Sequence, residues 1–147
     1  MKIGLVFIGA IREQLPVIRE NIIALKESFK EHELSVILST WFPLSEEYII
    51  HGNKYAYDYD FNEFLNSCKD LVDEFIILKQ DTSKYLMLNN RWFPDHPPIY
   101  MYHMIEVSKY LKEKNFEFDH IVKSRHDNLF KIKNSDNYLN DKLTVPL

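Results

Sequence analysis

Four short polar clusters hold most of the residues of this chain that could do chemistry. They span 9–12, 39–41, 79–81 and 124–128, and each follows an apolar segment. Arg12, Arg125 and Asp127 stand out, because a guanidinium group binds a phosphate through two hydrogen bonds and a carboxylate holds a divalent cation. Arginine suits bidentate phosphate recognition better than lysine does. We therefore expect these clusters to bind a phosphorylated ligand.

The apolar segments before the clusters are predicted to be β-strands. They span 3–9, 34–38, 75–78 and 120–124, and they are short, rich in branched or aromatic residues and bounded by polar residues. Between them, apolar residues at spacings of three and four predict three amphipathic helices. The buried stripes are expected to be Leu15, Ile18, Ile22, Leu25 and Phe29; then Phe61, Phe64, Leu65, Cys68, Leu71 and Val72; then Met101, Met104, Ile105, Ser108 and Leu111.

This alternation of strands and helices predicts an α/β fold, a Rossmann-like three-layer α/β/α arrangement with a mostly parallel sheet. In such sheets ligands bind outside the carboxyl ends of the strands, so the four clusters should meet at one edge. Two stretches, 41–59 and 80–96, are too long for simple connections and are expected to be irregular.

Composition narrows the function classes. The chain has 147 residues, the size of one domain, and its net charge of −4 offers no general attraction to nucleic acid or anionic lipid. Its single cysteine, Cys68, cannot form an intramolecular disulfide, which favours a reducing compartment, the cytoplasm. No apolar stretch approaches the ~20 residues of a transmembrane helix. The three glycines, Gly4, Gly9 and Gly52, cannot form a dinucleotide fingerprint or a P-loop, so nicotinamide-cofactor enzymes and P-loop NTPases are disfavoured.

Three motifs carry a resemblance to a known family: Phe-Ile-Gly-Ala-Ile-Arg at 7–12, Ile-Leu-Ser-Thr-Trp at 37–41 and Val-Lys-Ser-Arg-His-Asp-Asn at 122–128. Together they resemble the nucleotide-sugar half of glycosyltransferases with the A-type fold, and most closely the bacterial surface-polysaccharide enzymes related to WavE of lipopolysaccharide synthesis. Asn89-Asn90-Arg91 is also similar to an asparagine-arginine element of these families.

The resemblance implies that this chain helps to transfer a sugar from a nucleoside-diphosphate sugar to a glycan or lipid-linked acceptor. Asp127 would hold Mn²⁺ or Mg²⁺ where A-type enzymes carry an Asp-x-Asp motif, although Arg125 replaces the first aspartate. The catalytic base is not identified. The residues that would bind the nucleotide sugar are Gly9, Ala10, Arg12, Thr40, Trp41, Asn90, Arg91 and Arg125.

Length sets this chain apart from the family, whose members continue past the metal motif into an acceptor-binding region. Here twenty residues follow Asp127, so we expect a single nucleotide-sugar-binding domain spanning 1–147, either as a fragment or as a domain that binds the donor without completing transfer. Two alternatives stay open. One is a non-catalytic module that binds a nucleotide sugar or a protein, and the other is a metal-dependent phosphotransferase or hydrolase.

Purely structural roles compete with these assignments. Asp127 could cap the chain after its strand, Arg125 could pair with it, and Arg12 could be a surface residue at a helix start. Trp41 could fill the core, and His103 is expected to be a partly buried, neutral helix residue.

Overall fold

The computed structural model describes residues 1–9, 15–42, 47–50, 53–56, 61–79 and 97–125. Its centre is a four-stranded sheet with the order β5-β2-β1-β6, in which every pairing is parallel. The strands are β1 (Lys2–Ile8), β2 (Glu33–Phe42), β5 (Glu74–Lys79) and β6 (His120–Ser124). The four predicted strands and the parallel α/β arrangement are thereby confirmed.

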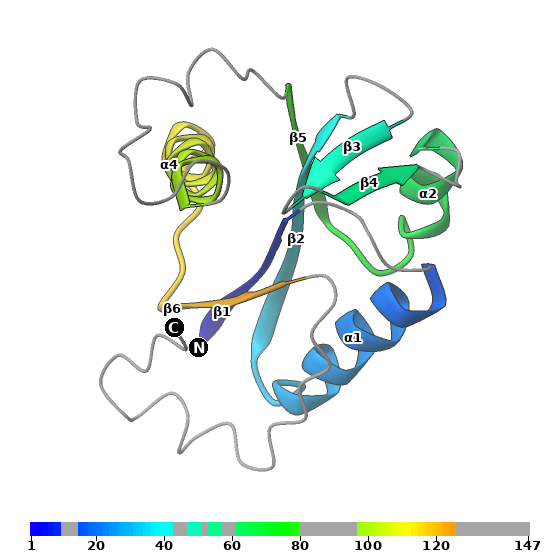
Figure 1. Ribbon diagram of the computed structural model, residues 1–147. Coiled ribbons are helices and arrows are strands. Elements are labelled where there is room, and N and C mark those ends of the chain that lie inside the picture. The colour runs from blue at the N-terminus through cyan, green and yellow to red at the C-terminus, as the bar shows by residue number, and fades with distance from the viewer. Residues whose placement is uncertain (10–14, 43–46, 51–52, 57–60, 80–96, 126–147) are drawn as a thin grey trace.

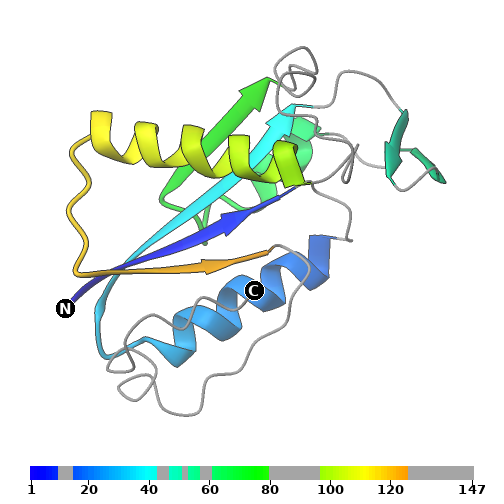
Figure 2. The same cartoon turned by 60° about the vertical axis from the view of Figure 1, so that its left-hand side comes forward.

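Helices cover both faces of this sheet. α1 (Leu15–Ser28) and α2 (Phe61–Ser67) lie on one face, and α4 (Pro97–Glu113) lies on the other (Figures 1 and 2). The helix stripe predicted for α1 is confirmed, since Ile18, Ile22, Leu25 and Phe29 are all buried. They pack against alternate residues of β1 and β2, because side chains on one face of a strand recur at every second position.

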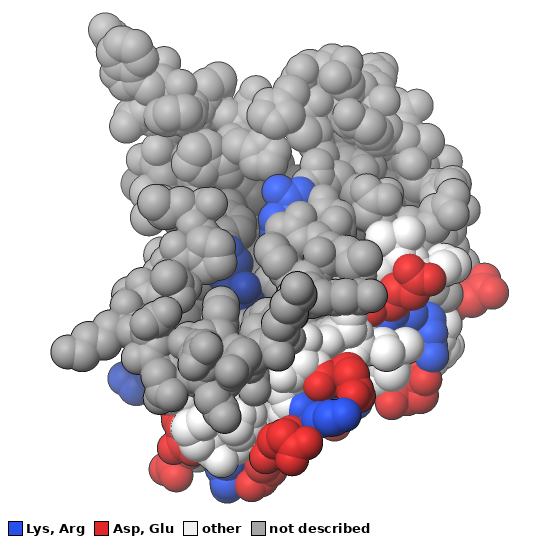
Figure 3. All heavy atoms as spheres, turned by 90° about the horizontal axis from the view of Figure 1, so that it is seen from below, with Lys and Arg blue, Asp and Glu red and all other residues white. Residues whose placement is uncertain are grey.

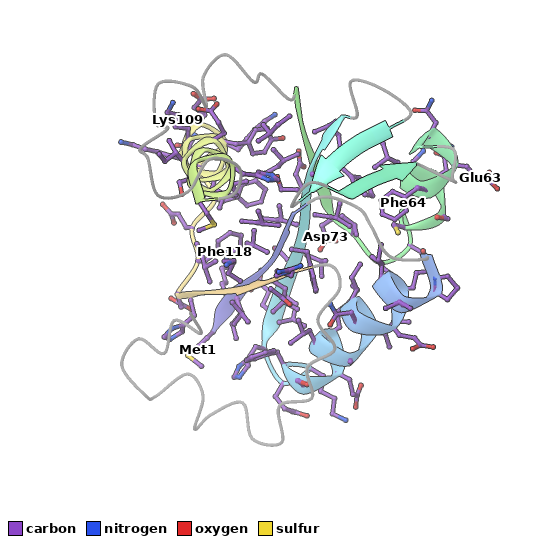
Figure 4. The ribbon with its side chains drawn as sticks, in the orientation of Figure 1. Met1, Glu63, Phe64, Asp73, Lys109 and Phe118 are labelled. Carbon is purple, nitrogen blue, oxygen red and sulfur yellow. The ribbon has the colours of Figure 1, made fainter. Side chains whose placement is uncertain are left out.

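α2 is shorter than the sequence pattern predicts. The helix ends at Ser67, whose hydroxyl donates to the carbonyl of Phe64 at 2.7 Å, and a turn follows in which the amide of Val72 donates to the carbonyl of Cys68 at 3.0 Å. Serine side chains compete with the helical hydrogen bonds in this way. The turn still buries Cys68 and Val72 beside Phe64, so the predicted packing holds, and burial raises the pKa of the Cys68 thiol. Glu63 points away from this core (Figure 4).

The buried face of α4 differs from the predicted one. Ile105 is 48% exposed and Ser108 is exposed, whereas His103, Val107 and Leu111 are buried. These three residues are spaced four apart and therefore lie on one helix face. The prediction is correct for Leu111 and for Met104, which packs against the same cluster, but it omits His103 and Val107. A histidine does not count as apolar in a periodicity search. Lys109 points away from the sheet (Figure 4).

A left-handed residue ends α4 and redirects the chain toward β6. Asn115 has a φ of 55°, and the amide of Phe116 donates to the carbonyl of Leu111 at 3.0 Å, which is a common way to close a helix. The turn brings Phe116 and Phe118 into a stacked pair with centroids 5.5 Å apart. Phe118 packs on the α4 side of the sheet, where it lies over Gly4 of β1 (Figure 4).

The stretch 41–59 was predicted to be irregular, and that prediction was wrong. Trp41 and Phe42 extend β2, and β3 (Glu47–Ile50) pairs antiparallel with β4 (Asn53–Ala56). Because Ile50 pairs with Asn53, two residues including Gly52 connect the strands, a length typical of β-hairpins. Both strands mix polar and apolar residues without regular alternation, so the pattern that identifies the equally short apolar segment 75–78 is missing here. Residues 80–96 lie outside the described part of the chain.

Candidate functional site at the carboxyl edge of the sheet

The strand order reverses direction at β1. The chain passes from β1 to β2 and on to β5 on one side, and then returns through α4 to β6 on the other side of β1 (Figure 2). Open parallel sheets bind ligands at the carboxyl edge beside such a reversal. Phe7 of β1 pairs with Ser124 of β6, so Gly9 and Arg125 leave neighbouring strand ends. The first residues of these two clusters therefore lie side by side, whereas Arg12 and Asp127 lie outside the described residues.

Gly9 has a backbone conformation that only glycine adopts readily. Its φ is 148°, and its amide donates to the carbonyl of Ser39 at 3.2 Å, one step beyond the end of β1. A side chain at this φ would be strained. Gly9 therefore lets the chain leave the sheet at the edge where a ligand is expected.

Arg125 is exposed, but its main chain is held firmly. Its carbonyl accepts hydrogen bonds from Nδ2 of Asn21 at 2.9 Å and from the hydroxyl of Ser124 at 3.1 Å. Lys123, two residues earlier, projects to the opposite face from Ser124. Burial, and then the charge of Arg125, lowers the pKa of the Lys123 ammonium. Two neighbouring basic side chains thus lie at the end of β6.

Thr40 lies at the carboxyl end of β2, where it is 1% exposed. Its hydroxyl has no hydrogen-bond partner among the residues that the structure describes. Buried polar atoms nearly always have a partner, so a water molecule or a ligand atom is the expected one here. Trp41 follows on β2, and its side chain lies outside the described set.

On the other face of β2, Ser39 and His103 form a buried hydrogen bond. Oγ of Ser39 lies 2.6 Å from Nε2 of His103, and the same hydroxyl donates to the carbonyl of Ile76 at 3.3 Å. A hydroxyl has one proton, so the imidazole is then the donor to Ser39. A nucleophilic serine would have the reverse polarity and access to substrate, whereas Ser39 is 0% and His103 is 1% exposed. The pair therefore links α4 to the sheet. His103 is more deeply buried than the sequence suggests.

Five predicted site residues lie outside the described residues, namely Ala10, Arg12, Asn90, Arg91 and Asp127. Among the side chains that are described, no three His, Cys, Asp or Glu residues gather as metal ligands. Of the predicted set, the structure thus places Gly9, Thr40 and Arg125 at the carboxyl edge.

A depression of about 420 Å³ lies at the opposite, amino edge of the sheet, lined by Met1, Lys2, Glu33, Glu117, Phe118 and Asp119. Its polar groups interact with one another. The amide of Lys2 donates to Asp119 at 2.7 Å, and the Lys2 ammonium lies 3.9 Å from Glu33. The amino edge of a parallel sheet is not where ligands usually bind, so we assign no chemistry to this depression.

Comparison of the chain with protein-family models, with curated proteins and with solved structures finds no match. The described helices include none with the length and apolar character that a membrane crossing requires. The arguments about function below therefore rest on the residues and their geometry.

Sequence reasoning missed Asn21, which is 0% exposed on α1. The signal was available, since Asn21 lies three residues after Ile18 and four before Leu25, on the buried stripe of the helix. What the sequence could not supply was its partner, because Arg125 is 104 positions away.

Proposed function

We propose that this chain is the donor-binding part of a glycosyltransferase with a Rossmann-like, A-type fold, acting in the cytoplasm on a nucleoside-diphosphate sugar. The observation that carries the proposal is the parallel pairing of β1 with β6, from which Gly9 and Arg125 leave at adjacent points. The acceptor would be a surface glycan or a lipid-linked precursor, as in lipopolysaccharide biosynthesis.

The charges at the end of β6 suit such a donor. Sugar transfer leaves a nucleoside diphosphate, and its developing negative charge must be stabilised in the transition state. Arg125 offers a guanidinium fork for the diphosphate, and the half-buried Lys123 adds a second positive charge. Asp127, two positions further on, is the residue that we propose to hold Mn²⁺ or Mg²⁺, because these ions prefer carboxylate oxygen. A bound divalent ion would supply further charge stabilisation to the leaving group.

The neighbouring residues would complete the donor site. Gly9 and Ala10 would line the nucleotide pocket, with Arg12 beside the diphosphate. Thr40 has a buried hydroxyl without a described partner, which suits a hydrogen bond to the donor. Further contacts with the donor would come from Trp41 at the end of β2, and from Asn90 and Arg91, which precede α4 in the sequence.

Isothermal titration with uridine, guanosine and cytidine diphosphates in the presence of Mn²⁺ tests this proposal. We expect at least one of them to bind, and we expect Arg125→Ala and Asp127→Ala each to raise its Kd by about tenfold or more, the effect of losing one charge-assisted contact. Arg125→Ala keeps the backbone carbonyl that Asn21 and Ser124 contact, so the fold should survive.

Lys109→Ala is the matched control, since it removes a cation from the face of α4 that points away from the sheet (Figure 4). It should leave the Kd unchanged. The proposal is wrong if none of the three diphosphates binds, or if Arg125→Ala binds as tightly as the wild type. Turnover of a nucleotide sugar would indicate an enzyme, and binding without turnover would indicate a donor-binding module.

A further inference from the structure

Asn21 is an amide side chain buried inside an otherwise apolar helix face. It is 0% exposed, and Ile18, Ile22 and Leu25 around it belong to the apolar core. Burying an amide costs free energy unless its hydrogen bonds are replaced. An apolar residue at this position would pack in the core without that cost. The hydrogen bond that the Asn21 amide makes should therefore explain why an asparagine is found here.

That contact is made with the end of β6. Nδ2 of Asn21 donates to the carbonyl of Arg125 at 2.9 Å, and Ser124, itself 4% exposed, donates its hydroxyl to the same oxygen at 3.1 Å. The pairing of β6 with β1 ends one residue earlier, at Ser124. Asn21 thus continues the hydrogen bonding of β6 beyond the point where the strand ladder stops.

Two donors to one carbonyl fix the orientation of the peptide group between residues 125 and 126. A carbonyl oxygen has two lone pairs, and both are used here. The orientation of this carbonyl group constrains the main-chain conformation of Arg125, the residue that directly follows β6. Asn21 of α1 therefore holds the main-chain segment from which the exposed Arg125 side chain projects.

We infer that Asn21 is a positioning residue for Arg125 at the diphosphate site; this inference rests on the proposed function. Asn21 does not touch the ligand. It acts by holding the main chain of Arg125, so that the guanidinium group reaches the diphosphate without first ordering the strand end, which would cost binding free energy.

The experiment is a double-mutant cycle on the Kd of the diphosphate that binds the wild type, measured with Mn²⁺. Asn21→Leu keeps the size of the side chain and removes the donor. We expect it to raise the Kd about fivefold in the wild-type background, the effect of one hydrogen bond, and less than about twofold in an Arg125→Ala background. Ser108→Ala removes an exposed hydroxyl from α4 and should leave the Kd unchanged in both backgrounds.

A second readout does not depend on nucleotide. Amide hydrogen exchange at 122–125 should be faster in Asn21→Leu than in the wild type, while exchange in β2 stays the same. Asn21→Ser, which is smaller and polar, takes the place of Asn21→Leu in both measurements if leucine prevents folding.

Four results overturn the inference. An equal loss of affinity in both backgrounds would mean that Asn21 supports the fold rather than Arg125. Unchanged exchange at 122–125 would mean that Asn21 does not hold the strand end. If the wild type binds none of the three diphosphates, the proposed function fails and this inference fails with it, whereas binding that Asn21→Leu leaves unaltered defeats the inference alone.

Discussion

Two glycines, Gly4 within β1 and Gly9 directly after it, occupy positions that do not readily accept a side chain. Gly9 has a φ of 148°, which a residue with a side chain rarely adopts. Gly4 is required for a different reason, because a Cβ placed there would lie 2.9 Å from two ring carbons of Phe118. Gly4 thus determines how closely the chain that connects α4 to β6 approaches the sheet.

We expect Gly4→Ala to lower the free energy of unfolding by about 1 to 3 kcal/mol, the usual cost of overpacking a core. In a Phe118→Leu background, which removes the opposing ring, the same substitution should cost less than about 1 kcal/mol. Urea denaturation of the four proteins gives the coupling between the two sites. Equal costs in both backgrounds would show that the ring does not set the size limit at Gly4.

At the scale of elements, side-chain hydrogen bonds join each helix to a neighbouring helix or strand. Arg19 of α1 donates to Asp70 at 2.6 Å and to the carbonyl of Ser67, which ties α1 to the end of α2 and lowers the pKa of the Asp70 carboxyl. His103 ties α4 to β2, and Tyr110 ties α4 to Glu74 at the start of β5. These contacts fix the helices on the two faces of the sheet.

Tyr110 gives this linkage a pH dependence. The hydrogen bond to Glu74, and then burial, raises the pKa of the Tyr110 phenol. Its stabilising contribution is therefore complete below the unfolded tyrosine pKa of about 10 and is lost as the pH rises through the folded value. We expect Tyr110→Phe to cost about 1 kcal/mol at neutral pH and to lose less stability than the wild type between about pH 9 and pH 11.

Urea unfolding of the wild type and of Tyr110→Phe across that pH range measures the difference between their free energies of unfolding. Taking this difference cancels the contribution of the other titrating groups, which the two proteins share. Parallel stability curves for the two proteins would show that the phenol does not carry this alkaline transition.

How far the sequence predicts these elements depends on where the polar residues fall. The apolar stripe of α1 is uninterrupted enough to be predicted correctly, whereas the face of α4 is displaced because buried His103 counts as polar. The strands of the β3–β4 hairpin mix polar and apolar residues without regular alternation, so they produce no periodic signal. For the site, sheet topology predicts that the ends of β1 and β6 are neighbours, but the contact of Asn21 with Arg125 depends on how α1 packs against the sheet, which the sequence pattern does not specify.

The whole molecule is a sheet between two helical layers, and its two edges differ in charge arrangement. At the amino edge, the Lys2 ammonium lies 3.9 Å from Glu33, and Asp119 accepts a hydrogen bond from the backbone amide of Lys2. On the described part of the face in Figure 3, acidic and basic side chains are interspersed. At the carboxyl edge, Lys123 and Arg125 place two cations at the end of one strand. Under the proposed function, this is the edge at which the diphosphate binds.

The most direct test of that conclusion is to map diphosphate binding by nuclear magnetic resonance, titrating the ¹⁵N-labelled protein with uridine diphosphate and Mg²⁺. The account predicts the largest amide shifts at Gly9, Thr40 and Arg125, with little change at Lys2, Glu33 and Asp119. Shifts centred on those three amino-edge residues, or no shifts at either edge with any of the three nucleoside diphosphates, would contradict it.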